Sequence, residues 1–284
     1  MSKISVVLAS NDAGVHVDGA SLGALKLGED LKDKIVLEQV KFNKSHDKND
    51  LKKNLKEVNS FNEKLYNKIY DELSNDNKVL TIGGDHSIAI GSALASIKYN
   101  KNCGIIWIDA HGDYNTFETT ITGNLHGLPL AVIDNYEKTL LNEFHDGNYI
   151  SPKNTVIVGA RDIDPLELDN LKDAGVTIFT TNDVHTLGAE EVMNLAFKVA
   201  SFNVDKVHVS YDIDVIDPKI ACGVSIPAVD GINEEEAYNI MDEVLKHKDI
   251  INSMDLVEYN SVLDKDNKTY DIAKKLRDKI LNNL

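Results

Sequence analysis

The chain has 284 residues, 42% of them hydrophobic, which is enough to bury a full core and fits one large domain, residues 1–284, better than two small ones. Its net charge of −16 argues against a nucleic-acid partner, which would need clustered Lys and Arg, and it permits attraction of a cationic substrate. The sequence has no run of about 18 apolar residues that could span a bilayer and no apolar signal-peptide core, so we expect a cytoplasmic protein with no membrane partner.

Short apolar runs alternate with longer amphipathic segments, which is the pattern of strand–helix–strand units around a mostly parallel sheet. In chain order we predict a strand at 3–9, a helix at 48–74, a strand at 78–82, a helix at 87–99, strands at 104–109, 154–160 and 176–180, a helix at 188–202, a strand at 205–212, a helix at 233–248, a strand at 251–257 and a helix at 269–282. The helix at 233–248 opens with Asn233 and three glutamates, which suit a helix N-terminus. The sequence therefore predicts an α/β fold with a central, mostly parallel sheet.

Polar residues follow several of the predicted strands at once. The segments are GGDHS (83–87), DAHGD (109–113), ARDID (160–164), DIDVIDP (212–218) and EYNS (258–261). Because ligands of open parallel sheets bind at the carboxyl ends of the strands, we expect several of these segments to converge on one site.

Two of these segments place acids and histidine at alternate positions. Asp109, His111 and Asp113 can point to one side if the extended geometry of the preceding strand continues, since side chains in a strand alternate with a period of two. Asp212 and Asp214 repeat this spacing. A single acid at a strand end is commonly a cap or loop residue, but the combination favours one shared site.

His86, which follows the glycine pair 83–84, adds a second imidazole to these four carboxylates. Four negative charges at the end of a buried sheet are costly without counter-charge, because desolvation and mutual repulsion act together. Two divalent cations with shared carboxylates and a bridging water would remove that cost. Oxygen and imidazole ligands without thiolate suit Mn²⁺ or a neighbouring first-row ion better than a structural zinc. The sequence thus predicts a dinuclear metal centre.

The segments GGDHS (83–87), DAHGDYNT (109–116), GNLHG (123–127), SYDIDVIDP (210–218) and DLVEYN (255–260) resemble the arginase family of the ureohydrolases, in the family's order and over nearly the whole chain. This resemblance implies a three-layer α/β/α fold with the metal site at the C-terminal ends of the strands, two Mn²⁺ ions per subunit, and hydrolysis of a guanidinium group with release of urea. It also implies the ligands of the two ions, which are His86, Asp109, Asp113 and Asp212 for one ion and Asp109, His111, Asp212 and Asp214 for the other.

A guanidinium cation is a poor electrophile, and a hydroxide bridging two metal ions, with its pKa lowered and its position fixed, is a nucleophile able to attack it. In the mechanism that the resemblance supports, Asp113 passes a proton to the leaving amine, His126 exchanges protons with solvent, and Glu258 pairs with the guanidinium. Without the resemblance, His126 would be interpreted as an exposed loop histidine and Glu258 as a surface acid at the end of a strand.

Arginine-specific members of the family carry an Asn two residues after the last acid of D-A-H-x-D and then a Gly-Asn-x-His-Gly loop, and this chain has both. The resemblance therefore implies L-arginine, cleaved to L-ornithine and urea, as the small-molecule substrate. The implied contacts of the α-carboxylate are Asn115, Thr120 and Thr122, with Asn124 close by, and those of the α-amino group are Asp164 and, through water, Glu167.

Two positions near the implied substrate depart from the family, since Thr122 replaces a usual Ser and Ile226 replaces a usual Thr. Both bear on substrate preference, so agmatinase, guanidino-acid hydrolase and formimidoylglutamase activities remain alternatives. A dinuclear phosphoesterase is more remote, because Leu125 interrupts the G-N-H motif that such enzymes use. A non-catalytic metal-bound scaffold is disfavoured because His126 and Glu258 accompany all six ligands. The resemblance further implies a homo-oligomer, a trimer or hexamer.

Overall fold

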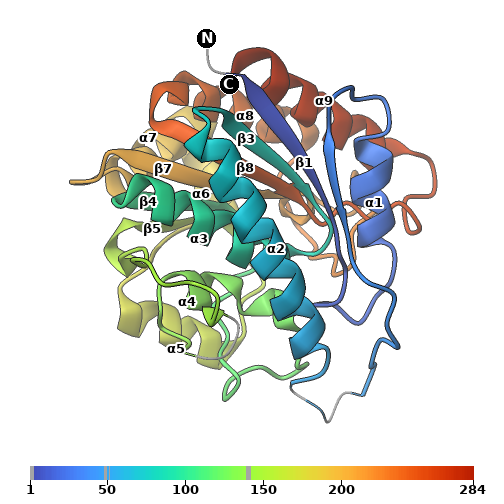
Figure 1. Cartoon of the computed structure of the whole chain (residues 1–284). Helices are drawn as coiled ribbons and strands as arrows, with labels where there is room; N and C mark the ends of the chain where they lie inside the picture. The colour runs from blue at the N-terminus through green and yellow to red at the C-terminus, as the bar shows by residue number, and fades with distance from the viewer. Residues whose placement is uncertain (1–2, 48–49, 51, 139–141) are drawn as a thin grey trace.

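The computed structural model describes residues 3–47, 50, 52–138 and 142–284, which form one central sheet of eight parallel strands (Figure 1). The strands are β1 Ile4–Ser10, β2 Ile35–Glu38, β3 Lys78–Gly83, β4 Cys103–Ile108, β5 Thr155–Ala160, β6 Thr177–Thr180, β7 Lys206–Asp212 and β8 Ile251–Val257. Their order across the sheet is β2-β1-β3-β8-β7-β4-β5-β6, and every paired strand runs parallel to its neighbour. The carboxyl ends of all the strands therefore lie along one edge.

Helices cover both faces of this sheet within the described part of the chain (Figure 1). One face carries α2 Leu55–Ser74, α3 Ala89–Asn100, α4 Pro129–Ile133 and α5 Pro165–Ala174. The other carries α1 Ala20–Leu27, α6 Thr181–Leu187, α7 Ala189–Ala200, α8 Glu234–Lys246 and α9 Lys268–Asn283. The predicted α/β fold with a mostly parallel sheet, and the three layers that the family resemblance implied, are confirmed.

The alternation of side chains in each central strand builds the two cores. In β1, Val6 and Leu8 belong to the core under α1, α7, α8 and α9, whereas Val7 and Ala9 belong to the core under α2 and α3. Because both faces of the strand are buried, the strand needs an almost unbroken apolar run. This is why the central strands could be recognised from the sequence.

The predicted strands match the observed ones to within one residue at each end, but β2 was not predicted. It is a four-residue strand at the edge of the sheet, and its side chains alternate between partly buried and exposed. Four predicted helices match α3, α7, α8 and α9 to within two residues. The start predicted at position 48 is wrong, because α2 begins at Leu55 after Asn54, whose φ of 61° is left-handed; positions 48, 49 and 51 lie outside the described residues.

The helices α1, α4, α5 and α6 were not predicted either.

Within the described ranges, no helix combines the length and the apolar character required to cross a membrane.

Candidate functional site

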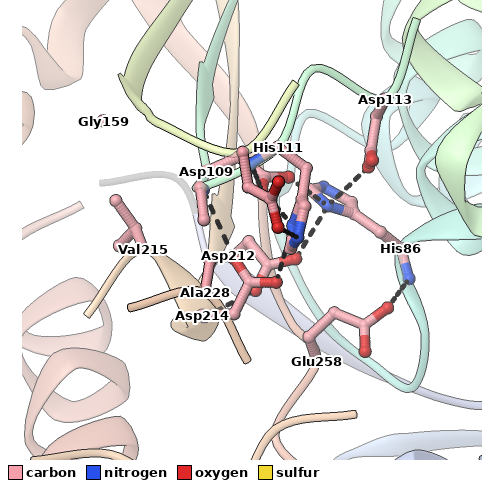
Figure 2. A network of polar contacts seen from close by, with 12 residues as sticks. His86, Asp109, His111, Asp113, Gly159, Asp212, Asp214, Val215, Ala228 and Glu258 are labelled. Carbon is pink, nitrogen blue, oxygen red and sulfur yellow. Dashed lines mark hydrogen bonds and ion pairs between the residues drawn. The ribbon is translucent and has the colours of Figure 1, made fainter. Parts of the chain in front are cut away.

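The predicted metal ligands follow three strands that lie close together in the sheet. His86 comes after β3 and the segment 109–113 after β4, while Asp212 is the last residue of β7 and Asp214 follows it. β8, which lies between β3 and β7, brings Glu258 to the same edge (Figure 2). The common strand direction thus gathers residues that are far apart in the sequence.

A tight turn after β3 places His86. A Cβ on Gly84 would lie 1.8 Å from the backbone oxygen of Asn11, so only glycine fits at this position. The His86 ring stacks on Trp107 with ring centroids 3.8 Å apart, and its Nε2 lies 2.9 Å from Ser210 Oγ. These contacts fix the ring and turn Nδ1 toward the carboxylates.

Three carboxylates surround Nδ1 of His86 (Figure 2). This nitrogen lies 3.0 Å from Asp109 Oδ2, 3.0 Å from Asp212 Oδ2 and 3.2 Å from Asp113 Oδ2. It is buried, and among the described residues no group meets it with hydrogen-bond geometry. A nitrogen and three oxygens that converge without bonding to one another are arranged as ligands around a common centre.

A second group lies beside the first and shares Asp109 with it. His111 Nδ1 is 3.0 Å from Asp214 Oδ2 and 3.4 Å from Asp109 Oδ1. Asp109 therefore turns one carboxylate oxygen to each histidine. In each group, His86–Asp109–Asp212 and Asp109–His111–Asp214, the ligand atoms all lie within 4.8 Å of one another. The structure thus brings the predicted ligands together, and their role in holding a metal stays a prediction.

The local cause of this convergence differs from the one that the sequence suggested. β4 ends at Ile108, so its extended geometry does not continue through residues 109–113. Asp113 has a φ of 48°, in the left-handed region, and this turn brings its carboxylate back toward His86. Asp214 lies in a short 3₁₀ turn whose N-cap is Asp212. The period-two spacing therefore identified the right residues, but turns after the strands, and not continued strand geometry, bring their carboxylates together.

The cluster requires positive charge. Asp109, Asp113, Asp212 and Asp214 are each at most 6% exposed. Burial and the neighbouring carboxylates raise the pKa of Asp113 to about 6 and raise the pKa of Asp212 well above its usual value. Burial opposes a charge on His86, but the surrounding carboxylates outweigh it and raise the pKa of His86 well above the usual value. A divalent cation would supply this charge, so buried oxygens and imidazoles of this kind fit a metal ion.

A buried polar network lies beneath His86. Asp255 in β8 accepts hydrogen bonds at Oδ2 from Ser92 Oγ at 2.5 Å and from Ser210 Oγ at 3.4 Å, and His208 Nε2 lies 3.0 Å from the same oxygen. All four side chains are fully buried. Because Ser210 also contacts the ring of His86, the network fixes the orientation of that ring.

Arg161, directly after β5, joins the segments on either side of the site. Its guanidinium donates hydrogen bonds to the backbone oxygens of Asp214 at 2.8 Å, Val215 at 2.9 Å, Ala228 at 2.9 Å, Val229 at 3.0 Å and Gly159 at 3.3 Å. The position of Asp214 therefore depends on Arg161. The sequence analysis missed this role, although an arginine directly after a buried strand was a usable signal.

His126 and Glu258 form an ion pair beside the cluster. Nδ1 of His126 lies 2.8 Å from Glu258 Oε1. The same oxygen accepts the backbone N–H of His86 at 2.8 Å (Figure 2). Burial opposes a charge on His126, but Glu258 outweighs it and raises the pKa of His126 to about 9. Within the described part of the chain, Glu258 Oε2 is buried without a hydrogen-bond partner. One carboxylate oxygen is thus left for a cationic ligand.

A cavity of about 240 Å³ opens on the cluster. Its lining includes the predicted residues His111, Asp113, Asn115, Thr122, Asn124, His126, Asp164 and Glu167. It also includes Ile226, the family departure noted above, and three residues that the sequence analysis missed, which are His16, Gly127 and Asp162. Thr120 is not part of the lining; its Oγ1 accepts the backbone N–H of Gly123 at 3.1 Å.

Glu167 is built into the start of α5. Its Oε1 accepts the backbone N–H of Tyr114 at 2.8 Å, and its Oε2 accepts the backbone N–H of Asp164 at 3.1 Å. With Asp164 as N-cap and Pro165 as the first helical residue, this arrangement is a capping box. Burial raises the pKa of Glu167 to about 8. Both carboxylate oxygens are engaged, which agrees better with ligand contact through water than with direct contact.

Comparison with known proteins agrees with this geometry. Residues 3–282 match the model of the arginase family. The arginase of Bacillus subtilis (strain 168) is 40% identical over 247 residues, which are 86% of this chain and 83% of that protein. A crystal structure of arginase from Bacillus subtilis has a TM-score of 0.84 at 34% identity and covers 98% of both chains. Entamoeba histolytica arginase in complex with L-ornithine has a TM-score of 0.86 at 30% identity and covers 98% of this chain and 97% of that chain. This chain therefore belongs to the arginase family.

Proposed function

We propose that this chain is a hydrolase that cleaves the guanidinium group of L-arginine to L-ornithine and urea, with two Mn²⁺ ions per subunit. The observation that carries the proposal is Asp109, which turns one oxygen to each of two histidine-containing groups that share it. One ion would be held by His86, Asp109, Asp113 and Asp212, and the other by Asp109, His111, Asp212 and Asp214. The naming of relatives as arginases, one of them in complex with L-ornithine, supports the choice of substrate.

A bound pair of divalent ions would supply a water of lowered pKa and the positive charge that the cluster requires. Glu258 orients the substrate, because its unpaired Oε2 can accept hydrogen bonds from a planar guanidinium. Its other oxygen is engaged by His126 and by the backbone of His86, which holds the carboxylate in place.

Asp113 and His126 move protons. Asp113 lines the cavity and lies beside His86, so its carboxylate can take up a proton at the reacting end and pass it to the leaving amine. His126 also lines the cavity, and its side chain is 14% exposed, which allows its imidazole to exchange protons with solvent.

The far end of the cavity recognises the amino-acid head of the substrate. Asn115, Thr122 and Asn124 line the part that the α-carboxylate would meet. Thr120 supports this loop through the backbone of Gly123, which is an indirect role. Asp164 faces the α-amino group, and Glu167 reaches it through water.

A substrate panel tests the proposal. With the Mn²⁺-loaded protein, kcat/KM for L-arginine should exceed that for agmatine on the order of 100-fold or more, because agmatine has no carboxylate for the far end of the cavity. Release of urea and of ornithine or putrescine gives the two rates. Equal or faster cleavage of agmatine, guanidinobutyrate or formimidoylglutamate would overturn the substrate and leave another ureohydrolase.

A substitution tests the chemistry separately. Asp113→Asn should lower kcat on the order of 100-fold or more, because the amide cannot carry the proton. Asp169→Asn, an exposed acid in α5, is the control and should keep full activity.

We also propose that residues 1–284 form one cytoplasmic domain and that this domain assembles into a trimer or hexamer. Light scattering of the Mn²⁺-loaded protein measures the mass of the assembly.

A further inference from the structure

The charges that line the cavity are unevenly distributed. Four lining residues are acids, Asp113, Asp162, Asp164 and Glu167, and within the described chain the lining contains no Lys or Arg. An acidic wall suits the guanidinium and the α-amino group of the proposed substrate but repels its α-carboxylate. Some group near the carboxylate end has to offset this repulsion.

His16 lies beside the amide of Asn124 in this lining. Of the three lining histidines, His111 faces Asp214 in the metal cluster and His126 faces Glu258, whereas His16 contacts Asn124. The distance between His16 Nδ1 and Asn124 Nδ2 is 2.9 Å. His16 lies in the loop after β1 and thus reaches Asn124 from a segment distant in the sequence.

The amide of Asn124 carries the second observation. Asn124 is 5% exposed, and within the described residues its Oδ1 is buried with no hydrogen-bond partner. The oxygen and nitrogen of an amide are nearly identical in shape, so their placement follows from the hydrogen bonds available. In the orientation that the structure shows, Nδ2 donates one hydrogen to His16 Nδ1, whereas a turned amide would place both hydrogens at the buried position of Oδ1. His16 thus holds the amide in place and leaves the second hydrogen of Nδ2 for a carboxylate.

A buried lysine adds positive charge behind the same loop. Lys53 is only 4% exposed, and its Nζ donates a hydrogen bond to the backbone oxygen of Thr122 at 2.6 Å. The ammonium therefore sits next to Thr122, which lines the carboxylate end together with Asn124. Burial makes its field stronger there than it would be in water.

We propose that His16 is a specificity-determining residue, which orients the Asn124 amide so that the second hydrogen of its Nδ2 binds the α-carboxylate of the substrate, with Lys53 supplying charge from behind. The inference rests on the proposed function, since it names the group that recognises the carboxylate of that substrate. His16 does not act on the reacting atoms, so its loss affects binding and leaves the chemical step intact.

The test compares His16→Ala with the unchanged protein on L-arginine and on agmatine, both with Mn²⁺. His16→Ala should raise KM for L-arginine about ten-fold, the effect of a hydrogen bond to a charged group, and change kcat less than about two-fold. The kcat/KM for agmatine should stay the same. His16→Gln, whose amide oxygen can still accept from Asn124 Nδ2, should recover most of the lost affinity for L-arginine.

His46→Ala is the matched control. His46 Nδ1 lies 3.0 Å from the backbone oxygen of His16, but His46 does not line the cavity, so the variant should behave as the unchanged protein. An unchanged KM for L-arginine in His16→Ala would overturn the inference. So would an equal loss on agmatine, or an equal effect of His46→Ala, because each would point to a general loosening of the loop.

A binding measurement separates this inference from the proposed function. Calorimetry with L-ornithine and with 1,4-diaminobutane, which lacks the carboxylate, needs no turnover. A loss of about ten-fold in affinity for L-ornithine alone in His16→Ala supports the inference even if another guanidino compound proves to be the substrate. If the unchanged protein does not prefer L-ornithine to 1,4-diaminobutane, there is no carboxylate preference for His16 to set, and the inference is wrong.

Discussion

Asp134 shows how the burial of one carboxyl group makes stability depend on pH. The residue follows α4, is 7% exposed, and accepts a hydrogen bond at Oδ2 from the Tyr114 hydroxyl at 2.5 Å. Burial outweighs the hydrogen bonds from Tyr114 and Tyr136 and raises the pKa of Asp134 from 3.8 to about 7. Between these two values, the folded chain keeps a proton that the unfolded chain has lost.

The contribution of Asp134 to stability should therefore fall as the pH rises from about 4 to about 7. Asp134→Asn stays neutral, so relative to the unchanged protein it should gain stability over this range, by at most about 4 kcal/mol. Urea denaturation at about pH 4 and about pH 8 gives the difference in free energy of unfolding between Asp134→Asn and the unchanged protein at each pH. The exposed Asp169→Asn is the control. A difference between Asp134→Asn and the unchanged protein that is the same at both pH values would contradict the assignment.

Single residues were predictable where their type alone carries the chemistry. Four aspartates and two histidines after strands are unusual enough to indicate a metal site, and the structure brings them together. The place of Arg161 directly after a strand was a signal, but its partners are backbone oxygens of other segments, and the partner of His16 is an amide in another segment; neither kind of partner leaves a mark in the sequence. Contacts of this kind become visible only when the chain is folded.

Among the elements, α5 could have been predicted and was not. Its sequence has an N-cap Asp164, Pro165 at the first position, Glu167 three residues after the cap and Gly175 with a φ of 83° at its end. The acids were interpreted only as substrate contacts, although the same side chains also start the helix. α1 was harder to see, because its interior Gly23 packs against the backbone oxygen of Tyr259 and helix propensity disfavours glycine.

Arg161 links three elements of the site edge, and its replacement tests that link. Arg161→Lys should lower the free energy of unfolding by about 2–4 kcal/mol and weaken Mn²⁺ binding, because one ammonium cannot replace five hydrogen bonds to the segments that hold Asp214. Metal titration followed by activity, together with urea denaturation, measures both effects.

Arg277 provides the matched control for that experiment. It is 2% exposed in α9 and binds the backbone oxygen of Leu27 and the carboxylate of Asp30, away from the metal cluster. Arg277→Lys should lower stability without changing the Mn²⁺ titration. An equal shift of the titration in both variants would show that Arg161 acts through overall stability alone.

At the level of the whole chain, metal binding and folding should be coupled. Four buried carboxylates repel one another in the folded protein but not in the unfolded chain, so removal of the ions with a chelator should lower Tm. Mn²⁺ at about 100 times its Kd should add about 2.7 kcal/mol for each site. Calorimetry with and without Mn²⁺, and metal analysis for two equivalents per chain, test this.

Asp109→Asn removes the residue that both groups share and should reduce the bound metal below one equivalent. Asp12→Asn, a buried acid held by Ser21 and Lys44 outside the cluster, is a control that should still take up two. A Tm that Mn²⁺ leaves unchanged in the unsubstituted protein would contradict the coupling.

The place of β8 in the sheet has a consequence for synthesis. This strand is the last of the described strands along the chain, yet it lies between β3 and β7 and supplies Glu258. During translation, β3 and β7 have no shared neighbour until residue 257 has left the ribosome, so the two halves of the sheet cannot close. A nascent polypeptide therefore remains without the finished site until β8 and Glu258 have emerged, and the protein gains its chemistry in one late step.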